Sequence, residues 1–170
     1  MVDYANRGME LESLIDHMNT VYRHRRVALI QKIPAAWLPV RGRDGRIVAA
    51  KIDRKSGVDY MGVWHRGAMA FEVKSTMNKN NWSIGNLTED QFRFLVDHSV
   101  VNRNAFQFVL LGFMRLKRCY LLDLDFIQKV WGKWQDGGKA SVTVTELEGV
   151  PSMLINYPFD YLRLVEERFG

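Results

Sequence analysis

Two apolar runs joined by a short polar turn dominate the middle of the chain, between Ser56 and Ser75 (SGVDYMGVWHRGAMAFEVKS). The first run follows Asp59, and Arg66-Gly67 precedes the second. A turn at this place predicts that the two runs pair as an antiparallel β-hairpin. We expect the rest of the chain to be organised around this hairpin.

The second run carries a carboxylate and an amine two residues apart. Alternate side chains of a strand share a face. Met69, Phe71 and Val73 are therefore expected to point into a core. Glu72 and Lys74 are expected to lie together on the opposite face.

Asp59 stands thirteen positions before Glu72. Oxygens from two such carboxylates suit a hard divalent cation such as Mg²⁺, and Lys74 beside them can orient a water or neutralise a phosphate. These groups are the minimum for metal-assisted phosphodiester hydrolysis. The alternative is that the three charges decorate the solvated face of an amphipathic hairpin.

Length and composition indicate one folded domain. The chain has 170 residues, 47% of them hydrophobic and 12% aromatic, which argues against disorder. No apolar stretch reaches the roughly 18 residues that span a bilayer, and the N-terminus lacks the pattern of a signal peptide. The single cysteine, Cys119, is expected to be a small buried side chain, and no zinc-type cluster is present. We therefore expect a cytoplasmic protein that does not bind membranes.

Positive charge is concentrated in the first third of the chain. Between Tyr22 and Lys55 there are ten Lys and Arg against two acids, whereas the tail from Glu146 onward has five acids against two arginines. A one-sided basic region is typical of a protein that binds a polyanion such as nucleic acid. The alternative is a basic surface that serves solubility alone.

Within that basic region, residues 34–55 combine turn residues with arginine. Asp44-Gly45 is a strong turn signal between the apolar flanks at 36–38 and 47–50. We predict a projecting basic β-ribbon, or stalk, inserted between two core strands and able to bind DNA. Its apolar residues, including Trp37, leave open that it also packs on a second subunit.

The remaining patterns predict helices packed on a sheet. Apolar spacing predicts a helix over Gly8–Tyr22, in which Glu12 is either solvated or directed toward a site near the helix start. Thr88 and Gln91 form a capping-box pattern that begins a second helix and lets Gln91 face the hairpin. Further strands are predicted at 27–30, 105–113 and 118–124, with helices at 125–133 and 158–169. The expected fold is a single α/β domain over 1–170, with a mixed central β-sheet flanked by helices.

Four of these motifs together resemble the RecU family of Holliday junction resolvases, which belongs to the restriction-endonuclease-like PD-(D/E)xK nucleases. The motifs are Asn6-Arg7-Gly8-Met9 leading to Glu12, Asp59-Tyr60-Met61-Gly62, Phe71-Glu72-Val73-Lys74, and Gln91 nineteen positions after Glu72. The resemblance runs from residue 6 to the last helix. It implies a restriction-endonuclease-like core and a homodimer that nicks two symmetric strands of a four-way DNA junction with Mg²⁺ or Mn²⁺, in a bacterium or in one of its viruses.

The same resemblance implies roles for individual residues. Asp59 and Glu72 would hold the metal, and Lys74 would position or activate water. Gln91 would assist the site, and Glu12 would be a helix carboxylate near the metal. DNA contacts are expected from Arg7 and, along the ribbon, from Arg41, Arg43, Arg46, Lys51, Arg54 and Lys55. One departure is Val58, which stands where the family usually has Thr and so removes a hydroxyl beside Asp59.

Two other functions stay open at this point. The chain can be a non-catalytic DNA-binding module in which the ribbon binds and the hairpin charges are surface decoration. It can also be another PD-(D/E)xK nuclease that acts on duplex DNA.

Overall fold

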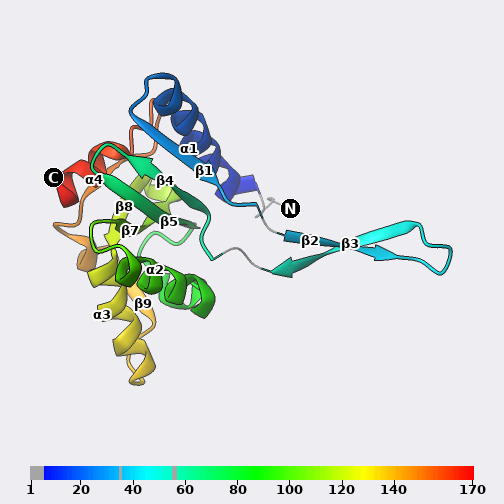
Figure 1. Cartoon of the computed structure of the whole chain (residues 1–170). Coiled ribbons are helices and arrows are strands. Elements are labelled where there is room, and N and C mark those ends of the chain that lie inside the picture. The colour runs from blue at the N-terminus through cyan, green and yellow to red at the C-terminus, as the bar shows by residue number, and fades with distance from the viewer. Residues whose placement is uncertain (1–5, 35, 55–56) are drawn as a thin grey trace.

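A six-stranded mixed sheet forms the centre of the molecule in the computed structural model, which describes residues 6–34, 36–54 and 57–170 (Figure 1). Across the sheet the strands are β1 (Ala28–Lys32), β4 (Tyr60–Trp64), β5 (Gly67–Thr76), β7 (Phe106–Phe113), β8 (Arg118–Asp123) and β10 (Ser152–Leu154). β5 and β7 are parallel, and every other neighbouring pair is antiparallel. The predicted hairpin is therefore confirmed as β4–β5, next to the middle of the sheet.

Helices cover both faces of this sheet (Figure 1). They are α1 (Asn6–His24), α2 (Glu89–Val101), α3 (Leu124–Gln135) and α4 (Leu162–Phe169). The core under α1 and α4 includes Phe71 and Phe108, whose rings stack 4.8 Å apart. The core under α2 and α3 includes Ala70 and Val109. Neighbouring residues of β5 and β7 thus enter opposite cores, as the pleat of a strand requires.

Short elements complete the body. β6 (Asn81–Ser83) pairs with β9 (Ser141–Thr143), and three 3₁₀ turns lie between longer elements: η1 (Ile84–Asn86), η2 (Met114–Leu116) and η3 (Thr145–Leu147). The last helix begins at Leu162 rather than at Pro158, since the backbone N–H of Tyr161 donates to the carbonyl of Phe159 in a turn that precedes the helix. Cys119 is also completely buried, as predicted.

The ribbon predicted between two core strands extends away from the body (Figure 1). It consists of β2 (Ala36–Arg41) and β3 (Ile47–Arg54), which form a separate antiparallel two-stranded sheet. Its turn contains Gly45 with φ 79°, a conformation that favours glycine. Apolar side chains on the ribbon are exposed, with Ile47 at 61% and Val48 at 65%. Arg41, Arg43 and Arg46 lie at or near the turn, and β3 also carries Lys51 and Arg54, so the ribbon combines exposed apolar side chains with basic residues.

The predicted architecture of a mixed sheet flanked by helices is confirmed. Among the helices in the described ranges, none is long and apolar enough to cross a membrane.

Candidate active site

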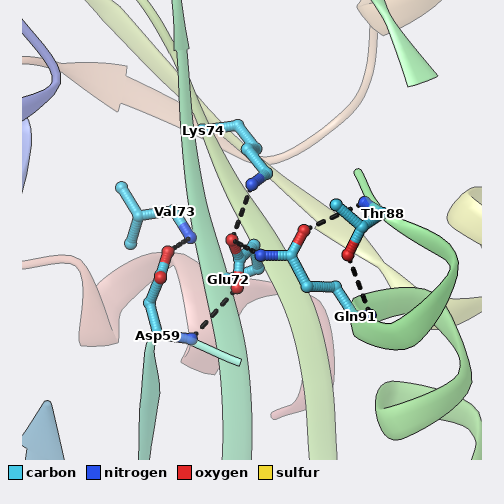
Figure 2. A network of polar contacts seen from close by, with 6 residues as sticks. All are labelled: Asp59, Glu72, Val73, Lys74, Thr88 and Gln91. Carbon is cyan, nitrogen blue, oxygen red and sulfur yellow. Dashed lines mark hydrogen bonds and ion pairs between the residues drawn. The ribbon is translucent and has the colours of Figure 1, made fainter. Parts of the chain in front are cut away.

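Asp59 and Glu72 lie side by side at the start of the hairpin. The register of β4 and β5 pairs Tyr60 with Phe71, which places Asp59 next to Glu72. The backbone N–H of Asp59 donates to Oε2 of Glu72 at 3.0 Å, and Oδ2 of Asp59 accepts from the backbone N–H of Val73 at 2.9 Å (Figure 2). Strand pairing therefore brings together two carboxylates that are thirteen positions apart in the sequence.

Glu72 also accepts two hydrogen bonds from side chains. Nζ of Lys74 lies 2.7 Å from Oε1 of Glu72, and Nε2 of Gln91 lies 2.5 Å from the same oxygen (Figure 2). Lys74 shares the strand face with Glu72, whereas Gln91 reaches it from α2. These contacts join four of the predicted site residues: Asp59, Glu72, Lys74 and Gln91.

Glu72 is almost fully buried, with 1% of its surface exposed. Burial, and after it the nearby charge of Asp59, raise the pKa of its carboxyl group to about 8, against the opposing effect of Lys74. The burial of Glu72 contradicts the alternative of a solvated strand face for this residue. The reason is that α2 covers this face of β5, which the hairpin sequence alone does not reveal.

The beginning of α2 fixes Gln91 in place. Oγ1 of Thr88 accepts from the backbone N–H of Gln91 at 3.3 Å, and the backbone N–H of Thr88 donates to Oε1 of Gln91 at 3.0 Å. The predicted capping box is thus confirmed. The amide of Gln91 serves both the helix start and the carboxylate of Glu72.

Glu12 lies in a second cluster, with a different partner. Its carboxylate accepts from Nζ of Lys32 at 2.5 Å, and Lys32 lies 3.7 Å from Asp16. The hydroxyl of Tyr60 donates to Asp16 at 2.7 Å. Desolvation lowers the pKa of Lys32, but the bond to Glu12 and the charges of Glu12, Asp16 and Asp59 outweigh it and raise the pKa above its ordinary value. The charge of Asp59 therefore acts on both clusters.

The sequence patterns predicted no role for Lys32 beyond its contribution to the basic region. Its partner Glu12 is 20 positions away on another element, so no local motif joins them. Val58, at the place where the family usually has Thr, is 1% exposed and belongs to the apolar core under α2 and α3.

The predicted DNA-binding residues lie apart from the carboxylates. Arg41, Arg43 and Arg46 are exposed at the ribbon tip, where Arg41 donates to the carbonyl of Gly45 at 2.9 Å and Arg46 lies 3.7 Å from Asp44. Lys55 is outside the described residues. Arg7 belongs to α1, and Lys51 and Arg54 belong to β3.

The donor set at Asp59 and Glu72 suits a hard cation. Across the described ranges, no group of three or more His, Cys, Asp or Glu side chains is arranged to hold a metal ion. Mg²⁺ is commonly held by one or two carboxylates, with waters and substrate phosphate oxygens as the other ligands. The pair of carboxylates fits that kind of site.

The mixed sheet flanked by helices, with Asp59, Glu72 and Lys74 in contact beside β5, has the arrangement expected from the resemblance to nucleases of the restriction-endonuclease-like class. The profile of the family described as Recombination protein U (RecU) matches residues 6–167, and the chain belongs to this family.

Three curated relatives carry the description "Holliday junction resolvase RecU". The protein of Geobacillus kaustophilus (strain HTA426) is 34% identical over 151 residues, which cover 86% of this chain and 74% of the relative. That of Geobacillus sp. (strain WCH70) is 31% identical over 173 residues, covering 97% and 85%. That of Bacillus cereus (strain B4264) is 30% identical over 171 residues, covering 96% and 84%. All three come from bacteria, which lends no support to a viral origin.

One solved structure similar to this chain is that of Archaeoglobus fulgidus Hjc, described as a Holliday junction resolvase from an archaeal hyperthermophile. The matched region covers 82% of this chain and 93% of the Hjc chain, with a TM-score of 0.49 and 12% sequence identity.

Proposed function

We propose that this protein is a metal-dependent endodeoxyribonuclease that resolves four-way (Holliday) DNA junctions by nicking two strands symmetrically, during recombination and repair. The observation that carries the proposal is the contact of Glu72 with Asp59, Lys74 and Gln91 in a chain of the RecU family. The relatives named as resolvases support the choice of substrate.

Asp59 and Glu72 are the proposed ligands of Mg²⁺ or Mn²⁺. When bound there, the cation would offset charge on the phosphate oxygens and lower the pKa of a coordinated water. The two carboxylates supply only negative charge, so hydrolysis of a phosphodiester needs this positive partner.

The other residues of the site position these groups. Lys74 holds its ammonium 2.7 Å from Glu72, where it can orient the attacking water or neutralise a phosphate oxygen. Gln91 fixes the rotamer of Glu72 through its amide. The charge of Asp59 helps to raise the pKa of Lys32, which is the partner of Glu12. We propose that Glu12 acts as a helix carboxylate near the metal.

The ribbon is the proposed junction-binding arm, which enters the centre of the junction. Its tip arginines suit phosphate contacts, which position a nucleic acid without reading sequence. The residues proposed to bind DNA are Arg7, Arg41, Arg43, Arg46, Lys51, Arg54 and Lys55. Recognition would then depend mainly on backbone charge and on the shape of the branch.

Two symmetric nicks require two active sites, so we propose a homodimer. Exposed apolar side chains support it: Leu29 on β1 and Val63 on β4 are paired in register and are 47% and 52% exposed. Exposed apolar side chains of the ribbon, Ile47 and Val48 among them, offer further surface for a second copy. We also propose one nuclease domain over residues 1–170, with residues 34–55 as an insertion.

The test offers four-way junction, linear duplex and flap DNA side by side, with Mg²⁺ and with EDTA. We expect paired nicks in the junction that require the metal. Binding without any nick would favour the non-catalytic module, and equal cutting of all three substrates would favour a duplex nuclease of the same class. Sedimentation at several concentrations tests the dimer.

A further inference from the structure

The polar loop between β5 and β6 follows the strand that carries Glu72 and Lys74 and takes no part in the chemistry described so far. β5 carries Glu72 and Lys74 on one face, and Thr76 is the next residue on that face. The loop follows at once, and its exposed residues are Asn78, Lys79 and Asn80. Three exposed polar residues therefore follow Lys74 after an interval of three residues.

The distance from the site suits contact with nearby nucleotides. At about 3.3 Å per residue, Thr76 lies roughly 13 Å from Glu72 along the strand, and the loop begins there. A DNA strand advances about 3.4 Å per nucleotide. The start of the loop thus lies about four nucleotides away from a phosphate held by Asp59 and Glu72.

Hydrogen bonds hold the loop in one shape. The backbone N–H of Asn78 donates to Oγ1 of Thr76 at 3.1 Å, and the backbone N–H of Asn80 donates to Oδ1 of Asn78 at 2.9 Å. The side-chain amide of Asn78 donates to Oδ1 of Asn81 at 3.1 Å, at the start of β6. A preorganised loop loses less conformational entropy on binding than a mobile one.

These internal bonds use the side chain of Asn78, whereas Lys79 and Asn80 are exposed. Both residue types read base edges in the major groove: asparagine bonds N6 and N7 of adenine, and lysine bonds O6 and N7 of guanine. The arginines of the ribbon tip can also contact base edges, but they belong to a separate sheet that extends away from the strand carrying Glu72. The loop places base-reading residue types directly after that strand.

We propose that Lys79 and Asn80 read base edges a few nucleotides from the cut phosphate and so select the positions at which a junction is nicked. The inference rests on the proposed function, because it assigns the sequence preference of that same site. Asn80 would favour adenine at one position and Lys79 guanine at a neighbouring one.

The experiment maps nicks in junctions with homologous arms, whose crossover can move through many sequences. Product ends are sequenced for the wild type, Asn80→Ala, Lys79→Ala and the control Arg103→Ala. Arg103 is exposed in the turn before β7, at the end of the sheet opposite to Thr76. We expect each loop variant to lose preference at one base position by roughly five- to a hundredfold, the range of a good base contact. Arg103→Ala should keep the wild-type pattern.

The outcomes separate this inference from the proposed function. Loop variants that still cut junctions with the wild-type distribution of nicks would overturn the role of the loop and leave the nuclease intact, as would a wild-type protein without any preference. A wild-type protein that never nicks a junction would overturn the proposed function and this inference with it. Asn80→Asp, which keeps the size of the side chain but replaces the amide donor with an acceptor, is the second variant. It should fold with an unchanged melting temperature and shift the preference from adenine toward cytosine, and an unaltered pattern would count against the proposal.

Discussion

Gln91 and Glu72 join the start of helix α2 to strand β5 through a single amide group. Nε2 of Gln91 donates to Oε1 of Glu72 at 2.5 Å, while its Oε1 accepts from the backbone N–H of Thr88 at 3.0 Å (Figure 2). Lys74 donates to the same oxygen of Glu72 at 2.7 Å. The position of Glu72 therefore depends on the first turn of α2.

Replacing Gln91 with alanine should lower cleavage by about ten- to a hundredfold, the usual cost of losing a group that orients a metal ligand. The loss of the capping box should also reduce the free energy of unfolding by about 1 kcal/mol. Cleavage rates over a series of Mg²⁺ concentrations and urea unfolding measure the two effects. Gln135→Ala, an exposed position on α3, is the control. Wild-type rates at every metal concentration would contradict the role given to Gln91.

Neutralising either central carboxylate should abolish cleavage while junction binding persists. Asp59→Asn and Glu72→Gln keep the size of each side chain but remove the negative charge that the cation needs. Gel-shift and nicking assays on the same junction separate the two functions, with the exposed Glu148→Gln as a matched control. Near wild-type cutting by both variants would remove these residues from the site.

Metal affinity should rise with pH up to about 8 and then level off. The pKa of Glu72 is raised to about 8, and the cation binds only the deprotonated carboxylate. Below that pH, the proton and metal compete, so affinity should change by up to about tenfold per pH unit. The shift in melting temperature caused by Mn²⁺, measured between pH 6 and 9, gives the profile. A flat profile would mean that Glu72 is already ionised at pH 6.

Without metal, the same pKa predicts how stability depends on pH. The folded-state pKa of Glu72 lies above the ordinary value of 4.5, so its stabilising contribution is complete below pH 4.5 and is lost as pH rises through about 8. Glu72→Gln cannot ionise and should not show this loss. Urea unfolding in EDTA gives the free energy of unfolding at pH 6 and pH 9. Between these pH values, the free energy of unfolding of the wild type should fall more than that of the variant. An equal difference at both values would contradict the prediction.

The ribbon tip should contribute to affinity through charge. Replacing Arg41, Arg43 and Arg46 with alanine should weaken junction binding and reduce its dependence on salt. The slope of the logarithm of the binding constant against the logarithm of the salt concentration should become less steep by about 0.9 for each phosphate that the ribbon no longer neutralises. The matched control removes three lysines at α3 and the turn that follows it: Lys129, Lys133 and Lys139. Equal losses of affinity in both triple variants would show that total charge matters rather than the ribbon, and unaltered binding in the first would refute its role.

Local sequence patterns were sufficient for several parts of the site. The turn at Arg66-Gly67 and the alternation in β5 predicted which side chains share a face, because strand geometry has a fixed period of two residues. The capping box was equally predictable, since its bonds join residues three positions apart. The turn residues and the apolar flanks on either side of them also predicted the ribbon.

Other features had no local signal. β10 and β6 have three residues each, too few to show a pattern. Arg168 on α4 forms an ion pair with Asp123 at the end of β8, across 45 positions of sequence. Such partners are chosen by the packing of whole elements, so no window of sequence contains both.

The sequence by itself determined the pairing of β4 with β5 and therefore the side-by-side placement of Asp59 and Glu72, because hairpin register follows from the turn and the alternation of side chains. Only the tertiary structure decided that Glu72 is buried and that its pKa is raised, because this required α2 to cover the strand face from a distant part of the chain. The pairing of Glu12 with Lys32 was decided in the same way, by the packing of α1 beside β1.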